Sequence, residues 1–302
     1  MNILITGGAG FVGRHVSEFL SSEHNITIFD NFSNSSKNSI IQLSKKGIKI
    51  VEGDILNNKE INENTKDQEI IIHLAAKISV EDSIKNPFET LEVNVLGTKN
   101  VLNACLKNNV KKIIIASSSA VYGEGLPGIK LKEDSKKNPI SPYGESKLVM
   151  EQEIAKFLSH HSNVECTILR FFNIFGIGQS NEYSGVITKF IEKISKNESL
   201  EIFGDGEQTR DFISIEDVVK SIFNALENKK SGTYNIASGK TTTINHLAKL
   251  LISFSKKEIQ VNYLPPKIGD IKFSQADISL ARKQINFSPQ LKIESIKKMI
   301  LN

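Results

Sequence analysis

A tyrosine and a lysine four positions apart, Tyr143 and Lys147, are the residues of this chain best suited to acid–base chemistry. On a helix, residues at this spacing share one face, so the phenol and the ammonium lie close together. A free phenol has a pKa of about 10, and a neighbouring positive charge favours the phenolate and lowers that value. Tyr143 is therefore a candidate base for removing a proton from an alcohol. Because this spacing also arises by chance on surface helices, the elements around it must support the assignment.

A glycine-rich turn follows the apolar run at the start of the chain. The sequence MNILIT is typical of a short buried strand, and GGAGFVG comes directly after it, before apolar residues at helical spacing. Gly7, Gly10 and Gly13 permit a tight turn in which a diphosphate approaches the backbone at a helix N-terminus. A second strand-like run ends at Asp30, near the roughly 20-residue offset of a ribose-binding acid. This order predicts a dinucleotide-binding unit.

Asp30 also indicates which dinucleotide is bound. A carboxylate accepts a hydrogen bond from a free ribose 2′-hydroxyl and repels a 2′-phosphate. No arginine lies between Asn31 and Ser36 to reverse that preference. We therefore expect NAD as the cofactor rather than NADP.

Composition excludes several classes of function. The 302 residues carry a net charge of only +4, and the basic residues are scattered, so nucleic-acid binding is not indicated. The two cysteines, Cys105 and Cys166, have neither disulfide nor metal-ligand spacing, which favours a reducing compartment and no metal. Neither a signal segment nor a long apolar run is evident, so we expect a cytoplasmic protein without membrane contact.

Strand-like and helix-like segments alternate along the first part of the chain. This alternation predicts an α/β fold with a doubly wound parallel sheet. Such sheets bind ligands beyond the carboxyl ends of their strands. The residues that follow the five predicted strands, and so are expected to converge there, are Gly7, Asp30, Asp54, Ala75 and Ser118.

The pattern becomes less regular after residue 172. We expect a nucleotide-binding domain over 1–172, rejoined by about 211–238, and a smaller C-terminal α/β substrate lobe over 173–302. The chain is long enough for both, since a nucleotide-binding domain takes about 150 residues.

Taken together, the motifs resemble the extended short-chain dehydrogenase/reductase family, in particular its nucleotide-sugar 4-epimerases of the UDP-glucose and UDP-N-acetylglucosamine type. The resemblance covers nearly the whole chain and implies a Rossmann fold. The matching segments include 6–13, 30–31, 53–55, 73–76, 94–98, 117–123, 142–147, 170–176, 204–212, 234–236 and 269–270.

The resemblance also assigns site residues. It implies catalytic roles for Ser118, Tyr143 and Lys147. Besides the glycines and Lys147, it implies cofactor contacts for Phe11, Val12, Asp30, Asn31, Asp54, Ile55, Leu74, Ala75, Ala76, Asn94 and Phe172. Besides Ser118 and Tyr143, it implies substrate contacts for Asn173, Val186, Ile202, Phe203, Arg210, Lys267, Asp270 and Ser274. Isolated residues of these types are more often core or surface, so the order of the whole pattern carries the assignment.

The implied reaction inverts C4 of a UDP-sugar through a transient 4-keto intermediate. Tyr143 exchanges the hydroxyl proton, Lys147 stabilises the phenolate, and Ser118 holds the reacting oxygen. Related dehydratases and decarboxylases carry an acid where this chain has Ser119 and Ala120. Epimerisation is therefore favoured over those reactions. A UDP-hexuronate substrate and a non-catalytic NAD-binding module are the remaining alternatives.

Two departures from the family pattern bear on the substrate. Lys267 stands where an arginine is usual, so the charge is kept but not the bidentate fork. Ser274 stands where some relatives carry a bulky tyrosine, which favours room for an N-acetyl group. The resemblance further implies a homodimer formed through helices near 88–107 and 143–159.

Overall fold

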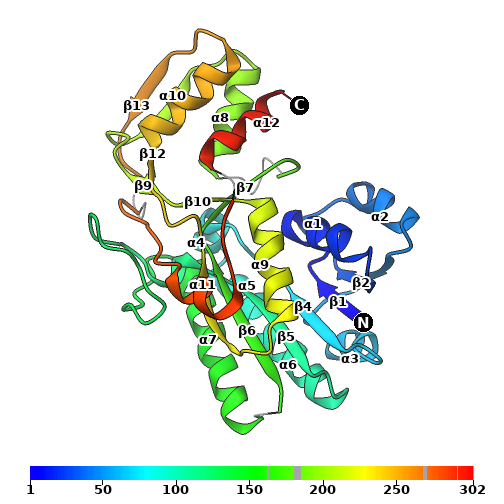
Figure 1. Cartoon of the computed structure of the whole chain (residues 1–302). Coiled ribbons are helices and arrows are strands. Elements are labelled where there is room, and N and C mark those ends of the chain that lie inside the picture. Colours follow the sequence, from blue (N-terminus) through cyan, green and yellow to red (C-terminus); the bar gives the residue numbers. More distant parts are fainter. Residues whose placement is uncertain (162, 180–184, 268–270, 291, 302) are drawn as a thin grey trace.

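A parallel seven-stranded sheet forms the centre of the computed structural model, which describes residues 1–161, 163–179, 185–267, 271–290 and 292–301 (Figure 1). Its strand order is β11-β6-β5-β4-β1-β2-β3, and every neighbouring pair is parallel. The strands are β1 Asn2–Thr6, β2 Asn25–Asp30, β3 Lys49–Glu52, β4 Ile70–His73, β5 Lys112–Ser118, β6 Glu165–Phe171 and β11 Gly232–Ile236. The predicted doubly wound α/β fold is confirmed.

Alternating residues of each strand enter two separate cores, as the period of two in a strand requires. In β1, Ile3 and Ile5 join the core on one face, while Leu4 joins the core on the other. In β5, Ile114 belongs to the first core. Burying one such side chain contributes about 1.5–3 kcal/mol, so a one-residue slip would be very costly. This packing fixes the register of the strands, and hence where each carboxyl end lies.

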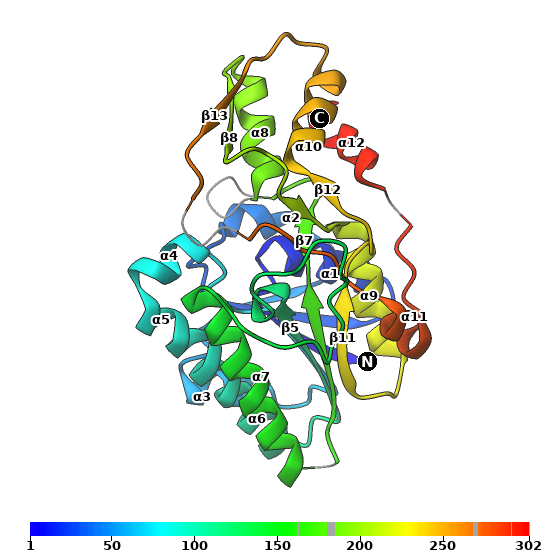
Figure 2. The same ribbon diagram turned by 90° about the vertical axis from the view of Figure 1, so that its left-hand side faces the viewer.

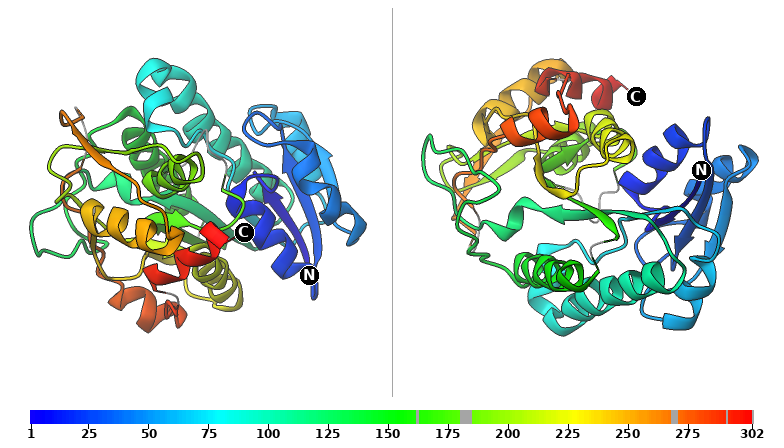
Figure 3. Two further views of the ribbon diagram at one scale, coloured as in Figure 1. Left: turned by 90° about the horizontal axis from the view of Figure 1, so that it is seen from above. Right: turned by 60° about the horizontal axis from the view of Figure 1, so that its bottom comes forward.

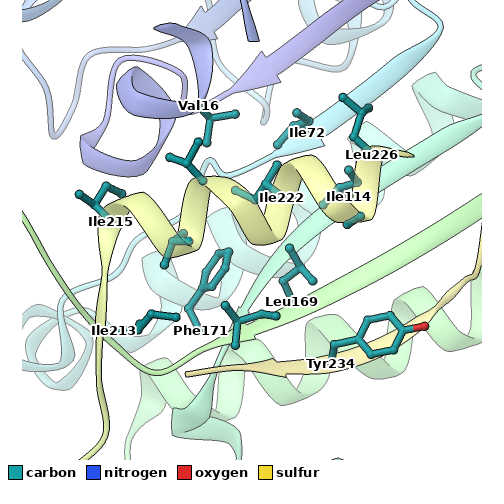
Figure 4. Packing of buried hydrophobic residues seen from close by; sticks show 14 of the residues in the cluster. Val16, Ile72, Ile114, Leu169, Phe171, Ile213, Ile215, Ile222, Leu226 and Tyr234 are labelled. Carbon is teal, nitrogen blue, oxygen red and sulfur yellow. The ribbon is translucent and has the colours of Figure 1, made fainter. Parts of the chain in front are cut away.

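Helices cover both faces of the sheet (Figure 3). One face packs against α1 Phe11–Leu20 and α9 Ile215–Glu227, and the other against α3 Asn58–Asn64, α6 Thr98–Lys107 and α7 Pro142–His160. In Figure 4, α9 crosses its face between Val16 of α1 and Leu169 of β6. The chain therefore returns to the large sheet after residue 211, through α9 and the edge strand β11.

The segment predicted as one helix over 88–107 is divided into three parts. The α-helix α5 Pro87–Leu91 passes into a π-helix, Glu92–Gly97, before α6 begins. The π-turn carries Asn94, which is buried and held by hydrogen bonds from other elements. A π-turn inserts an extra residue into a helix and redirects its side chains, which hydrophobic periodicity does not reveal.

The remaining elements form a smaller lobe beyond the carboxyl ends of the large sheet (Figure 2). Its core lies between α8 Val186–Ser195, α10 Ile244–Ser255, α12 Lys297–Leu301 and the parallel pair β8 Leu200–Phe203 and β13 Val261–Leu264. Short pairs join it to the first part: β7 Asn173–Phe175 with β10 Phe212–Ser214, and β9 Thr209–Arg210 with β12 Thr242–Thr243.

Shorter helices complete the described chain. They are a 3₁₀ turn Lys37–Ile40, α2 Ile41–Lys45, α4 Val80–Lys85, a 3₁₀ turn Ser119–Val121, α11 Ser279–Ile285 and a 3₁₀ turn Ile293–Ile296. Within the described ranges, no helix combines the length and apolar character that crossing a bilayer requires.

Candidate active site

One cavity of about 1350 Å³ lies between the large sheet and the smaller lobe. A pocket for a single small ligand usually measures about 300–1,000 Å³, so this cavity has room for two. Most of the predicted ligand-binding residues line it: Gly7, Gly10, Phe11, Val12, Gly13, Asp30, Asn31, Asp54, Ile55, Leu74, Ala75, Ala76, Ser118, Tyr143, Lys147, Phe172, Asn173, Val186, Ile202, Phe203, Arg210 and Lys267.

The glycine turn packs so tightly that side chains do not fit. Gly7 has φ +68°, and a Cβ there would lie 2.6 Å from the backbone nitrogen of Ala75. A Cβ on Gly13 would lie 2.3 Å from the carbonyl oxygen of Gly7. The glycines therefore let β1, α1 and the loop after β4 meet at one point. This arrangement leaves the backbone open to a dinucleotide diphosphate.

Asp30 connects the glycine turn to the ribose position. Its carboxylate accepts hydrogen bonds from the backbone nitrogens of Ala9, at 3.0 Å, and Phe32, at 2.8 Å, and from the Ser35 hydroxyl at 3.2 Å. A carboxylate has about four acceptor positions, so one remains for a ribose hydroxyl. Next to it, the Asn31 amide donates to Asp54 at 2.9 Å. The residues present thus fit an adenosine with a free 2′-hydroxyl.

The N-terminus of α7 places Tyr143 beside Ser118. The Ser141 hydroxyl caps the helix by accepting from Gly144, at 3.1 Å. A Cβ on Gly144 would lie 2.6 Å from the Ala120 carbonyl oxygen, so the absence of a side chain permits this approach. The Tyr143 backbone nitrogen also donates to the Ser83 hydroxyl at 3.1 Å. These contacts fix the phenol against the end of β5.

Burial raises the pKa of the Tyr143 phenol, and its hydrogen bond with Ser118 opposes that rise. The expectation that Lys147 holds this pKa below its ordinary value is therefore wrong for this structure. Loss of hydration raises this pKa, and the Lys147 ammonium donates to the Ala116 carbonyl oxygen at 3.0 Å. The spacing of Tyr143 and Lys147 in the sequence indicated that they share a helix face. It did not indicate how deeply the phenol is buried, and this burial raises its pKa.

Lys147 is itself buried. Burial lowers its pKa to about 8, while the negative charge of Glu151, one turn further along α7, acts in the opposite direction. The nearby His73 is held between the hydroxyls of Thr6, at 2.7 Å, and Thr98, at 2.9 Å. Burial and the Lys147 charge lower the pKa of His73 to about 3, so this imidazole is neutral.

A saturated polar network lies directly beneath these residues. Arg170 donates to both carboxylate oxygens of Glu151, at 2.9 and 2.6 Å, and to the Tyr122 hydroxyl at 2.7 Å. Ser117, the neighbour of Ser118, donates to Glu151 at 2.6 Å. We call these four residues the Glu151–Arg170 network. It joins β5, β6 and α7, so it holds Ser118 and Lys147 in a fixed relation.

Two of the predicted residues that the structure describes, Asn94 and Ser274, do not line the cavity. Asn94 is buried, and its amide is used by the backbone of Lys77, at 2.8 and 3.0 Å, and by the Ser146 hydroxyl, at 2.9 Å. It therefore positions the loop after β4. Asn94 was predicted to contact the cofactor, but it is not among the residues that line the cavity. Ser274 is also buried and away from the lining. Asp270 lies outside the described residues.

Comparison with known proteins decides the family. Residues 3–237 match the NAD dependent epimerase/dehydratase family. The chain belongs to this family. The predicted resemblance to NAD-dependent nucleotide-sugar epimerases is thereby confirmed, and the glycine turn and Asp30 fit the cofactor that this epimerase/dehydratase family uses.

Individual relatives agree with that placement over the full length. A putative UDP-glucose 4-epimerase of Methanocaldococcus jannaschii is 39% identical over 99% of this chain and 97% of its own. UDP-glucose 4-epimerase of Thermotoga maritima, solved with UDP-glucose, has a TM-score of 0.94 at 31% identity, covering 100% of this chain and 97% of its own. UDP-N-acetylglucosamine 4-epimerase of Methanobrevibacter ruminantium, solved with UDP-N-acetylmuramic acid, has a TM-score of 0.93 at 35% identity, covering 99% and 98%.

Glu81 and Lys189 are among the charged cavity residues that sequence reasoning missed. Lys189 follows Val186 by one helical turn on α8, so the predicted role of Val186 together with helical spacing pointed to it. Glu81 lies in the first turn of α4, where an acid is usual for reasons of helix stability alone. Only the fold brings it to the cavity.

Proposed function

We propose that this enzyme inverts the configuration at C4 of a UDP-sugar, either UDP-glucose and UDP-galactose or their N-acetylated forms. The observation that carries the proposal is the convergence of Ser118, Tyr143 and Lys147 on one cavity with the glycine turn and Arg210. A cavity large enough for two ligands brings a dinucleotide and a nucleotide-sugar together at one phenol.

The residues have distinct roles in this reaction. Tyr143 removes the proton of the sugar 4-hydroxyl and later returns it, while Ser118 holds the reacting oxygen. NAD, when bound, supplies the hydride acceptor and donor and a positive ring charge that favours the phenolate. Lys147 adds a buried positive charge on the same helix face. Arg210 holds the diphosphate by its paired donors while the keto sugar turns over.

Ser119 and Ala120 support epimerisation rather than elimination. Expulsion of water from the sugar needs an additional acid, and neither residue following Ser118 can supply a proton in that role. Inversion through a keto sugar needs only one acid–base group and a reversible hydride transfer. The proton and the hydride both return to the atoms they left, so there is no net oxidation.

Product analysis tests the proposal. The purified protein is incubated with UDP-glucose, UDP-N-acetylglucosamine and UDP-glucuronate, and the products are separated by chromatography. Tyr143→Phe should reduce turnover by at least about 100-fold. Tyr263→Phe, an exposed tyrosine that does not line the cavity, is the matched control and should keep full turnover. Conversion of none of the sugars by the wild-type protein would reject the function.

A second measurement separates hydride return from proton exchange. In heavy water, hydrogen that leaves and returns as hydride does not mix with solvent, so the product should carry no deuterium at C4. Deuterium at that carbon would indicate removal of the hydrogen as a proton and would reject the proposed mechanism.

We also propose that two copies of the chain associate through α5, α6 and α7. Phe88 is 86% exposed, and Leu91 and Leu96, later in the same helical segment, are exposed as well. Exposed large apolar side chains favour burial against a partner. Sedimentation velocity should give a dimer for the wild-type protein and a monomer for Phe88→Glu. A wild-type monomer at micromolar concentration would reject this assembly.

A further inference from the structure

An ion pair crosses the cavity from one part of the molecule to the other. The ammonium of Lys267 lies 3.3 Å from the carboxylate of Glu81, a residue 186 positions earlier in the sequence. Glu81 belongs to α4, which packs against α7, whereas Lys267 follows β13 of the smaller lobe. In Figure 2 the chain leaving β13 descends toward α4. Both side chains line the cavity, so the pair stands where a ligand has to pass or bind.

The charges of two lysines act on this carboxylate. The Lys267 ammonium lies 4.3 Å from the centre of the ring of Phe203, a predicted substrate contact. Lys189, on α8, also lines the cavity. The charge of Lys189, and then the hydrogen bond and charge of Lys267, lower the pKa of Glu81, so this carboxyl is ionised near neutral pH. Glu81 therefore neutralises part of the positive charge that lines the cavity.

We propose that Glu81 sets the affinity of the nucleotide-sugar site, because it pairs with Lys267 in the free protein and yields this cation to the diphosphate when the substrate binds. The proposal rests on the nucleotide-sugar function proposed above. A diphosphate carries more negative charge than one carboxylate and offers several oxygens to an ammonium group. It therefore replaces Glu81 as the partner of Lys267. Because Glu81 competes for this cation, it lowers the affinity for the substrate and speeds its release.

The exposure of the pair suits exchange. The side chains of Lys267 and Glu81 are 45% and 66% exposed. Exposed ion pairs are weak, worth about 0.2–1 kcal/mol, so a ligand opens this one easily. Removing the competing carboxylate should accordingly strengthen nucleotide binding by about 1.4- to 5-fold, which is the ratio of dissociation constants that this free energy gives.

Calorimetric titration with UDP and with uridine tests the role of Glu81. Glu81→Gln should bind UDP about 1.4- to 5-fold more tightly than the wild-type protein at low salt, and the gain should shrink in 0.5 M salt. Uridine, which has no phosphate, should bind both proteins equally. The effect of Glu81→Gln should be smaller in a Lys267→Met background, since the cation for which Glu81 and the diphosphate compete is then absent.

Asp82→Asn is the matched control. Asp82 lies in the same first turn of α4 and loses the same charge, but it does not line the cavity. Its UDP affinity should equal that of the wild-type protein. Equal or weaker UDP binding by Glu81→Gln would overturn the proposal, as would an equal gain from Asp82→Asn. Failure of the wild-type protein to bind UDP would instead overturn the proposed function and this proposal together.

Discussion

Two charged regions, one buried beneath Ser118 and Lys147 and the other spanning the cavity, differ in almost every physical respect. The Glu151–Arg170 network is buried and saturated, with side chains only 8% and 4% exposed for its two ions. The Glu81–Lys267 pair is exposed and makes a single contact at 3.3 Å. The first region joins β5, β6 and α7, and the second joins α4 to the segment after β13 across the cavity.

The difference separates charges that hold geometry from charges that are exchanged. Breaking a buried pair leaves an uncompensated ion, so such a pair keeps one arrangement. An exposed pair has water and ligands as alternative partners, so it is easily opened. The buried network, which holds the proposed catalytic residues Ser118 and Lys147, is of the first kind. The pair of Lys267 with Glu81 is of the second kind.

The largest expected effect breaks the buried pair. Glu151→Gln should lower the free energy of unfolding by about 3–5 kcal/mol, because Arg170 is left buried without its counter-ion. Glu52→Gln, which opens an exposed pair with Lys37, should cost less than about 1 kcal/mol. Urea denaturation of both variants measures the contrast. Equal losses would show that burial does not distinguish the two kinds of ion pair in this protein.

An intermediate effect concerns the glycine turn. Gly7→Ala should weaken NAD binding at least about tenfold, because the new Cβ would meet the Ala75 backbone at 2.6 Å and displace the loop. Gly128→Ala is a matched control, since Gly128 has φ +69° and no atom lies within 4 Å of its Cβ position. The control shares the left-handed strain but should bind NAD normally. Fluorescence titration measures the NAD affinity of both variants, and an equal loss of affinity would point to backbone strain alone.

The smallest effect is a shift in the pH dependence of turnover. In the proposed mechanism Lys147 acts as a cation, and its pKa is about 8 in the fold, so turnover should fall to about half its plateau near pH 8. An ordinary lysine would keep its charge to about pH 10. Between these values the unfolded chain binds more protons, so this group makes the fold more stable as pH rises. The loss of turnover is therefore not caused by unfolding, and circular dichroism at each pH checks that the protein stays folded. Full turnover up to pH 10 would contradict the predicted dependence on the charge of Lys147.

Most of the fold and of the cofactor half was predictable from the sequence. Alternating apolar runs and turn residues indicated the parallel sheet, since strand period and glycine conformation are local properties. Strand ends converge in any such sheet, so Gly7, Asp30 and Ser118 met as expected. The spacing of Tyr143 and Lys147 likewise placed both on one helix face.

Features that depend on contacts between distant segments were not predictable. The π-helix at Glu92–Gly97 and the buried position of Asn94 follow from hydrogen bonds to Lys77 and Ser146. The raised pKa of Tyr143 follows from burial, which spacing does not report. Glu81 was overlooked because an acid in the first turn of a helix has an ordinary local explanation.

The sequence by itself determined the order of strands and helices, the glycine turn and the types of the reacting groups, because periodicity and backbone conformation act over a few residues. The tertiary structure alone decided which charged groups are buried and which are exposed to solvent. Hydration of a group depends on everything packed around it, and segments as far apart as Glu81 and Lys267 become neighbours only after folding.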